Sequence, residues 1–323
     1  MSKKLLFLLP LVLVAALPLF WTNPYVLHML ILCMMWSVLG QSWNLLGGYT
    51  GQVSFGHAAF FGIGAYSAAL LVNGPGIPPA RAWLGLGLGG VTAVLLAVFI
   101  GWVCFRLRGP YFALSVMALS EVLHLIAINW KDVTNGAEGV LFIPAFNDKK
   151  YYYWIVLALA VSNFVCIKYV MKSKLGIYFL AIREDQDAAE SLGINTTVYK
   201  LASLLISAFF TGVAGAFYFN YMGFIDPGIV FDTAKISVMM ILVTMLGGAA
   251  TLAGPAVGAV LYILVSEILR AWLGQGHLVF FGVLIIVIIL FFPNGIVGTW
   301  KDRQARKAKG TAAAAPTATG GGA

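Results

Sequence analysis

Long apolar runs are the feature that most constrains this chain. A membrane-spanning helix needs about 20 mostly apolar residues, and ten stretches of the sequence approach that length. A soluble domain carries about 25% charged residues, whereas this chain of 323 residues carries 10%. The sequence therefore predicts an all-α polytopic membrane protein with about ten transmembrane helices and excludes a soluble domain. The ten stretches are 5–21, 26–46, 52–73, 84–105, 111–130, 152–171, 201–222, 232–252, 255–273 and 278–293.

Two of these stretches are candidates for broken or re-entrant segments: 52–73, which contains glycines at 56, 62 and 64, and 255–273, which follows the glycines at 247–254. Paired glycine- or proline-interrupted segments in the two halves of a chain are typical of transport proteins built from inverted repeats. The glycines at 247–254 weakly resemble those at 47–56. We therefore expect a weak inverted repeat.

The positive charges indicate the orientation in the membrane, because Lys and Arg accumulate in short cytoplasmic loops. With the N-terminus inside and ten crossings, 14 of the 20 basic residues fall on the inner side and both termini are cytoplasmic. A net charge of +8 distributed in this way does not indicate nucleic acid binding. The inner residues are Lys3, Lys4, Arg106, Arg108, Lys168, Lys172, Lys174, Arg183, Lys200, Lys301, Arg303, Arg306, Lys307 and Lys309.

The domain organisation follows from these spans. Residues 1–300 form one transmembrane domain, with an outer, periplasmic loop at about 131–151 and an inner, cytoplasmic loop at about 172–200. Residues 301–323 are basic and then low in complexity, which predicts a disordered cytoplasmic tail. The first stretch also resembles a secretory signal peptide, but no A-x-A cleavage pattern follows it, and we favour an uncleaved span.

The inner loop is predicted to contain a short helix over residues 181–194. Its small apolar residues follow helical spacing, and Gly193 stands where a helix C-cap is expected. A helix lying on lipid headgroups has a polar face rich in Lys and Arg, whereas this one is acidic. We therefore favour docking into a soluble partner over a loop lying on the membrane surface. The predicted docking residues are Arg183, Glu184, Asp185, Asp187, Ala188, Ala189, Glu190 and Gly193.

The run from Asp187 to Gly193, D-A-A-x-x-x-G, resembles the E-A-A-x-x-x-G coupling signature of ABC importer permeases, with Asp replacing Glu. The Ile-x-Leu-Pro that completes that signature is absent, and Ser203-Leu204-Leu205-Ile206 stands in its place. The wider pattern resembles the branched-chain amino acid permease family of the LivM type. The segments that carry this resemblance are 44–57, 183–189, 247–255 and 292–295.

This resemblance implies a permease subunit of an ATP-binding-cassette importer in the bacterial inner membrane. Such a subunit pairs with a second, homologous permease, docks cytoplasmic ABC ATPase subunits and receives its small-molecule substrate from a periplasmic binding protein. The implied substrates are leucine, isoleucine and valine, although related permeases import urea, short amides or aromatic acids. The chain has no GxxxxGK[ST] phosphate loop of its own.

Polar groups inside a bilayer are costly and tend to mark pathways. The candidates for lining a pathway are Asn44, Gln52, Ser54, His57 and Glu121. For Gln52 and His57, hydrogen bonding between helices is an equally good explanation. The glycines around them are better explained by close helix packing.

Two other classes of function compete with the importer permease. An ion-coupled secondary transporter would need buried ionisable residues, and Glu121 and Glu267 keep this class open. A membrane-embedded enzyme would need a catalytic constellation, and the sequence has no HExxH or GxSxG motif. We expect a protein that is not an enzyme, with no catalytic residues, no metal site and no cofactor.

Overall fold

The computed structural model describes residues 14–19, 23–72, 81–142, 144, 146, 148–273, 282 and 295–299. Within these residues, seven helical stretches are long and apolar enough to cross a membrane. The all-α, multi-pass class is confirmed, but a count of ten is not. The expected spans 5–21 and 278–293 lie largely outside the described residues, and the expected span 52–73 holds only a shorter apolar helix of 14 residues, His57–Leu70. The seven stretches are built on α2 (Pro24–Trp43), α4 (Arg81–Cys104), α5 (Pro110–Asn129), α7 (Lys149–Lys172), α10 (Thr196–Met222), α12 (Met239–Gly247) and α13 (Gly254–Leu273).

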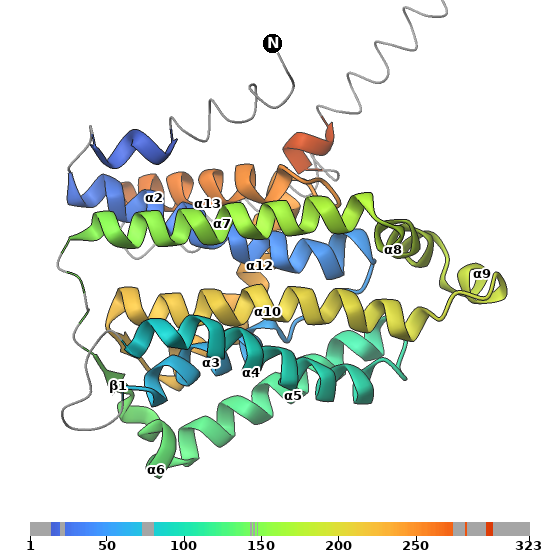
Figure 1. Ribbon diagram of the computed structural model, residues 1–323, viewed down its shortest axis with the longest axis horizontal. Helices are drawn as coiled ribbons and strands as arrows, with labels where there is room; N and C mark the ends of the chain where they lie inside the picture. The colour runs from blue at the N-terminus through green and yellow to red at the C-terminus, as the bar shows by residue number, and fades with distance from the viewer. Residues whose placement is uncertain are drawn as a thin grey trace, which may run out of the picture.

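The long helices run side by side between two ends of the molecule (Figure 1). In one layer α2 packs against α7 and α13, and in the other α10 packs against α4 and the shorter helix α3 (His57–Leu70). Helices α8 (Lys174–Glu184) and α9 (Gln186–Ser191) protrude at one end.

The opposite end carries the short elements of the loop at 131–151. These are α6 (Lys131–Thr134), η2 (Gly136–Glu138) and β1 (Val140–Leu141). Strand β1 pairs antiparallel with β2 (Phe224–Ile225), with Val140 opposite Ile225. This strand pair ties the loop to the end of α10.

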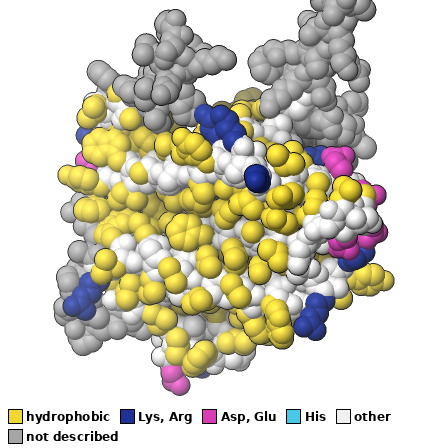
Figure 2. Space-filling model, turned by 45° about the vertical axis from the view of Figure 1, so that its right-hand side comes forward, with side chains coloured by type: hydrophobic (Ala, Val, Ile, Leu, Met, Phe, Trp, Pro, Cys, Tyr) yellow, Lys and Arg dark blue, Asp and Glu magenta, His cyan; other side chains and the backbone are white. Residues whose placement is uncertain are grey.

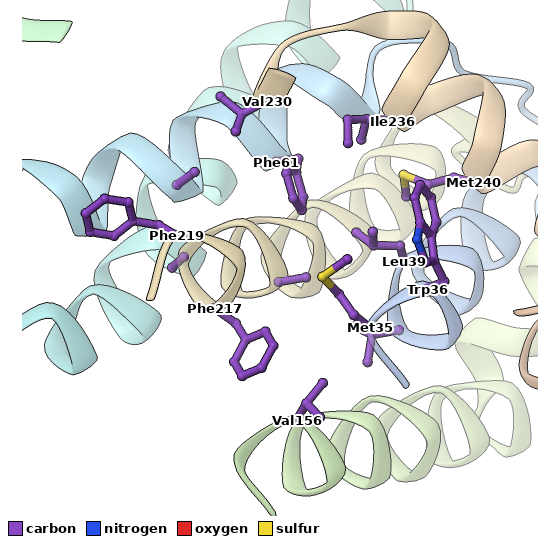
Figure 3. Packing of buried hydrophobic residues seen from close by; sticks show 14 of the residues in the cluster. Met35, Trp36, Leu39, Phe61, Val156, Phe217, Phe219, Val230, Ile236 and Met240 are labelled. Carbon is purple, nitrogen blue, oxygen red and sulfur yellow. The ribbon is translucent and has the colours of Figure 1, made fainter. Parts of the chain in front are cut away.

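The core between the layers is apolar. Met35 and Leu39 of α2 and Phe217 of α10 meet in it, and all three side chains are buried (Figure 3). Lipid is as apolar as this core, so the hydrophobic effect does not drive these side chains together within the membrane. Dense van der Waals packing between them stabilises the helix contacts instead.

Glycines allow three helices to approach backbone to backbone. A Cβ atom on Gly64 of α3 would overlap the carbonyl group of Gly212 on α10, and one on Gly212 would overlap the Gly89 carbonyl on α4. Small residues at helix interfaces permit this close approach in membranes. The packing role expected for the glycines of segment 52–73 is confirmed at Gly64.

The two stretches expected to be broken or re-entrant differ from one another. Residues 51–56 are not helical and α3 begins only at His57, so the break expected in 52–73 is present. The expected break in 255–273 is wrong, because Gly254–Leu273 is one continuous helix and the interruption precedes it at 248–253. The glycine at 258 packs against the backbone of Val243 and does not interrupt the helix.

The remaining irregular elements lie between α10 and α12. They are α11 (Pro227–Val230) and the π-helical η3 (Thr233–Val238), which leads into α12. A second π-helical segment, η1 (Asn44–Tyr49), extends α2. Such π segments occur frequently at functional sites, and η1 contains the first of the predicted pathway residues.

Candidate functional site

The predicted helix over 181–194 is divided in two at Asp185. Residues Arg183 and Glu184 end α8, while α9 begins after Asp185. The single helix expected from the sequence is therefore wrong. The physical reason is that Asp is a strong N-cap: the Asp185 carboxylate accepts hydrogen bonds from the backbone N–H groups of Asp187 at 2.9 Å and Ala188 at 3.0 Å.

The end of α9 lies where the sequence places it. Gly193 has φ +83°, a left-handed conformation that glycine adopts without steric cost. The N–H of Ile194 then donates to the carbonyl of Ala189 at 3.1 Å, as in a Schellman C-cap. A Cβ atom on Gly193 would meet nothing within 4 Å, so the space outside this turn is open.

Helix α9 presents one side to the protein and one to its surroundings. Ala189 is buried, whereas Ala188 is exposed and the Leu192 side chain is 82% exposed. A cavity of about 330 Å³ opens beside the end of α9. The residues that line it are Tyr178, Leu192, Gly193, Ile194, Asn195, Val198 and Tyr199. The exposed Leu192 side chain therefore borders an open cavity at the end of α9.

Arg108 lies in the connection between α4 and α5 and forms two ion pairs with α9. Its guanidinium group lies 2.5 Å from the Asp187 carboxylate and 2.9 Å from the Glu190 carboxylate. From the sequence alone, Arg108 is only one of the positive charges expected on the inner side. Its position between two spans gave no signal of its partners, because they lie 79 and 82 residues away.

A second set of hydrogen bonds joins α9 to the start of α10. The Thr196 hydroxyl donates to Glu190 at 2.5 Å, and the Lys200 ammonium donates to the Gln186 side-chain oxygen at 2.5 Å. Lys200 is only 1% exposed. Gln186, Thr196 and Lys200 were not among the predicted docking residues.

Helix α9 carries the acidic side chains of Asp187 and Glu190, and the basic side chain of Arg108 lies beside them at the same end. Figure 2 shows several acidic side chains gathered at the protruding end of the molecule with basic side chains next to them, beside an otherwise largely apolar surface. Hydrogen bonds from Thr196 and Gln186, with the nearby Arg108 charge, hold the pKa of Glu190 below its ordinary value. The carboxylate is therefore ionised at neutral pH.

Asn44 joins the two glycine-rich interruptions. Its side-chain N–H donates to the Thr251 carbonyl at 3.0 Å, and its oxygen accepts from the Ala250 N–H at 2.8 Å. The side chain is 0% exposed. The segments around 47–51 and 247–254, which the sequence suggested as related, thus lie in direct contact.

His57 belongs to a buried polar chain across four helices. The Ser207 hydroxyl donates to the Ser42 carbonyl at 2.7 Å, so its oxygen accepts from His57 Nε2 at 2.8 Å. Asn163 of α7 donates to the Ser42 hydroxyl at 3.0 Å. Nδ1 of His57 has no hydrogen-bond partner among the described residues. The sequence indicated His57 as a polar group in the membrane but gave no signal of its partner Ser207, or of Ser42 and Asn163 further along the chain of hydrogen bonds.

Ser54, Gln52 and Glu121 occupy different environments. Ser54 is buried, and its carbonyl accepts from the Trp43 indole at 2.8 Å. Gln52 is partly exposed in the extended stretch before α3. Glu121 lies on α5 with 53% of its side chain exposed and pairs with His124, one turn along the same helix, at 3.0 Å. The structure does not gather the five predicted pathway residues into one site.

Taken together, the apolar spans and the protruding helices define a multi-pass membrane protein with a charged helix pair at one end. Comparison with known proteins makes the class specific. Residues 25–291 match the family described as "Branched-chain amino acid transport system / permease component". The chain belongs to this family.

Individual relatives agree with this assignment. The chain is 27% identical to the high-affinity branched-chain amino acid transport system permease protein LivM of Salmonella typhimurium, over 91% of this chain and 75% of that protein. It is 22% identical to the probable LivM permease of Methanocaldococcus jannaschii, over 81% and 90%. It is also 26% identical to the probable LivH permease of that organism, over 51% of each chain. No solved structure gives a significant match.

Proposed function

We propose that this chain is the membrane permease subunit of an ATP-driven importer of leucine, isoleucine and valine. Family membership across residues 25–291 is the observation that carries this proposal. Relatives named for branched-chain amino acid transport support the substrate class. The chain lies in the bacterial inner membrane with both termini in the cytoplasm, and the end bearing α8 and α9 faces the cytoplasm.

The protruding helix α9 is the site at which a cytoplasmic ATPase subunit docks. Its exposed Ala188 lets a partner backbone approach closely, and exposed Leu192 offers an apolar anchor. Gly193 adds an open turn beside a cavity. The ATPase supplies the energy, and this subunit forms part of the path.

The path lies along α5, where a second permease subunit covers the exposed helix face. Glu121 is eleven residues beyond Pro110, about 16 Å along the helix at about 1.5 Å per residue. That is close to the middle of a hydrocarbon layer about 30 Å thick. A charged side chain there costs at least about 2.5 kcal/mol when it faces lipid, so this face needs protein or water against it.

Helix α4 provides the contrast. Its exposed side chains from Leu84 to Val103 are all apolar, as expected for a face in contact with lipid. Similarity to a LivH permease supports a homologous second subunit, because the two kinds of permease share sequence over half of this chain. A zwitterionic amino acid passing between the subunits then meets the Glu121 carboxylate through its ammonium group. A periplasmic binding protein delivers it.

The docking assignment is tested by co-purification with the ATPase subunits in mild detergent. Ala188→Arg places a long charged side chain on the exposed face of α9, and we expect the ATPase to be lost from the complex. Ala188→Ser keeps the residue small and serves as the matched control. Retention of the ATPase by the Arg variant, with normal uptake in proteoliposomes, would refute docking at α9.

The pathway assignment is tested by uptake of radiolabelled leucine. Glu121→Gln removes the charge without changing the size of the side chain, and we expect a lower rate of uptake. Glu138→Gln, on the exposed η2 at the other end of the protein, is the control. Equal uptake by the two variants would remove Glu121 from the path. Uptake driven by an ion gradient without ATPase subunits would favour a secondary transporter instead.

A further inference from the structure

Arg108 connects the docking helix to one particular membrane helix. It lies two residues before Pro110, where α5 begins, and its guanidinium group reaches both Asp187 and Glu190 on α9. The neighbouring Arg106 is placed differently: its guanidinium carbon lies 5.0 Å from the centre of the Trp102 ring. The link between α9 and α5 is therefore a property of Arg108 and not of positive charge in this loop generally.

Helix α9 is attached at the same time to α10. Glu190 accepts from Thr196 in the first turn of α10, and Gln186 accepts from the buried Lys200 one turn later. The two attachments use overlapping groups, since Glu190 contacts both Arg108 and Thr196. A displacement of α9 thus acts on α5 and α10 together.

The two membrane helices differ in how firmly the rest of the chain holds them. In the membrane-spanning part of α10, 67% of the residues are buried within the protein, whereas in that of α5 only 28% are buried. Within this chain α5 is therefore held by fewer buried residues than α10, and it carries Glu121 on the face proposed to meet the second permease. A pull at Arg108 is therefore expected to shift α5 relative to a fixed α10.

Stabilisation of the fold is a weak explanation for these ion pairs. The side chains of Arg108 and Asp187 are 58% and 79% exposed, and exposed ion pairs contribute little to stability. Their geometry is nevertheless specific, because one guanidinium group contacts two carboxylates one turn apart on α9. Such a contact fixes the relative position of two elements.

We propose that Arg108 is a positioning residue that transmits movement of the ATPase-docked helix α9 to α5. This inference rests on the proposed function, because it requires an ATPase bound at α9. During the transport cycle the ATPase displaces α9, the ion pairs carry that displacement to the start of α5, and the exposed face of α5 moves at the subunit boundary.

The test uses the complete importer in proteoliposomes, with ATP hydrolysis and leucine uptake measured in the same preparation. Arg108→Ala should retain the ATPase subunits and hydrolyse ATP, while leucine taken up per ATP falls by about tenfold, within the range typical of coupling between sites. Arg106→Ala is the matched control and should leave this ratio unchanged. Arg108→Lys, which keeps the charge but cannot contact both carboxylates equally, should fall between them.

A double-mutant cycle separates transmission from a general disturbance. If Arg108 acts through α9, adding Asp187→Asn to Arg108→Ala should produce no further loss of coupling. An unchanged ratio in Arg108→Ala, or losses that multiply in the combined variant, would overturn the proposal. Failure of the wild-type chain to bind an ATPase would instead refute the proposed function and this inference with it.

Discussion

Asn44 offers a direct test of whether a buried polar group in this protein serves the structure or the substrate. Replacing it by Ala removes the hydrogen bonds to Ala250 and Thr251 and leaves one backbone donor and one acceptor unpaired. An unsatisfied buried group costs about 1–3 kcal/mol. The two together predict a loss of about 2–6 kcal/mol in the free energy of unfolding.

The backbone around Asn44 has little room to move and form other hydrogen bonds in place of the lost ones. Ala250 has φ +55°, a strained conformation for a residue with a side chain. A Cβ atom on Gly48 would lie 2.8 Å from the Ala250 nitrogen, so the two segments are already in close contact. We therefore expect the loop at 248–253 to lose its present conformation in the Asn44→Ala variant.

The assay is thermal or denaturant unfolding of the purified protein in detergent, followed by tryptophan fluorescence. Asn129→Ala is the control, because that exposed side chain only donates to Leu125 in its own helix; its effect should be within about 0.5 kcal/mol. Asn44→Asp keeps the acceptor but sets a carboxylate against the Thr251 carbonyl, so it should be destabilised too. An Asn44→Ala protein as stable as the wild type but defective in uptake would refute the structural explanation and restore Asn44 to the pathway.

Two further predictions concern helix packing and pH. Gly64→Ala should destabilise the protein by about 1–3 kcal/mol or more, because its Cβ atom overlaps the Gly212 carbonyl. Gly87→Ala, which has open space around it on α4, should be neutral or slightly stabilising in the same unfolding assay, and equal effects would contradict the packing argument. The lowered pKa of Glu190 means that its ionised form stabilises the attachment of α9 above the ordinary pKa of 4.5, and that this contribution is lost as the pH falls through the lower folded-state value. Hydrogen exchange of the α9 amides, corrected for intrinsic pH effects, should therefore stay constant near neutral pH and increase only below about pH 4.5; an increase near neutrality would contradict this.

The sequence by itself determined the class of protein and its approximate spans. Runs of about 20 apolar residues have few alternatives to crossing a membrane as helices, because the backbone must satisfy its own hydrogen bonds in lipid. Local chemistry was equally informative at the end of α9, where Gly193 terminates the helix as expected. The motif around Asp187 also indicated the family that residues 25–291 match.

Predictions from local sequence were wrong where two sequence signals favoured different structures. Helical spacing favoured one helix through 181–194, but the capping strength of Asp185 divided it. Glycines at 254 and 258 suggested a broken span, yet they allow α13 to pack closely and stay continuous. In each case the outcome depends on what a residue contacts, which periodicity does not contain.

Only the tertiary structure decided the partners of the polar residues. Contacts such as Asn44 with Thr251, His57 with Ser207 and Arg108 with Asp187 join positions 79 to 207 residues apart. Sequence spacing identifies which polar groups are costly to leave in a membrane, because that cost belongs to the residue itself. It does not identify the groups that satisfy them, because those are set by which helices pack together and in which register.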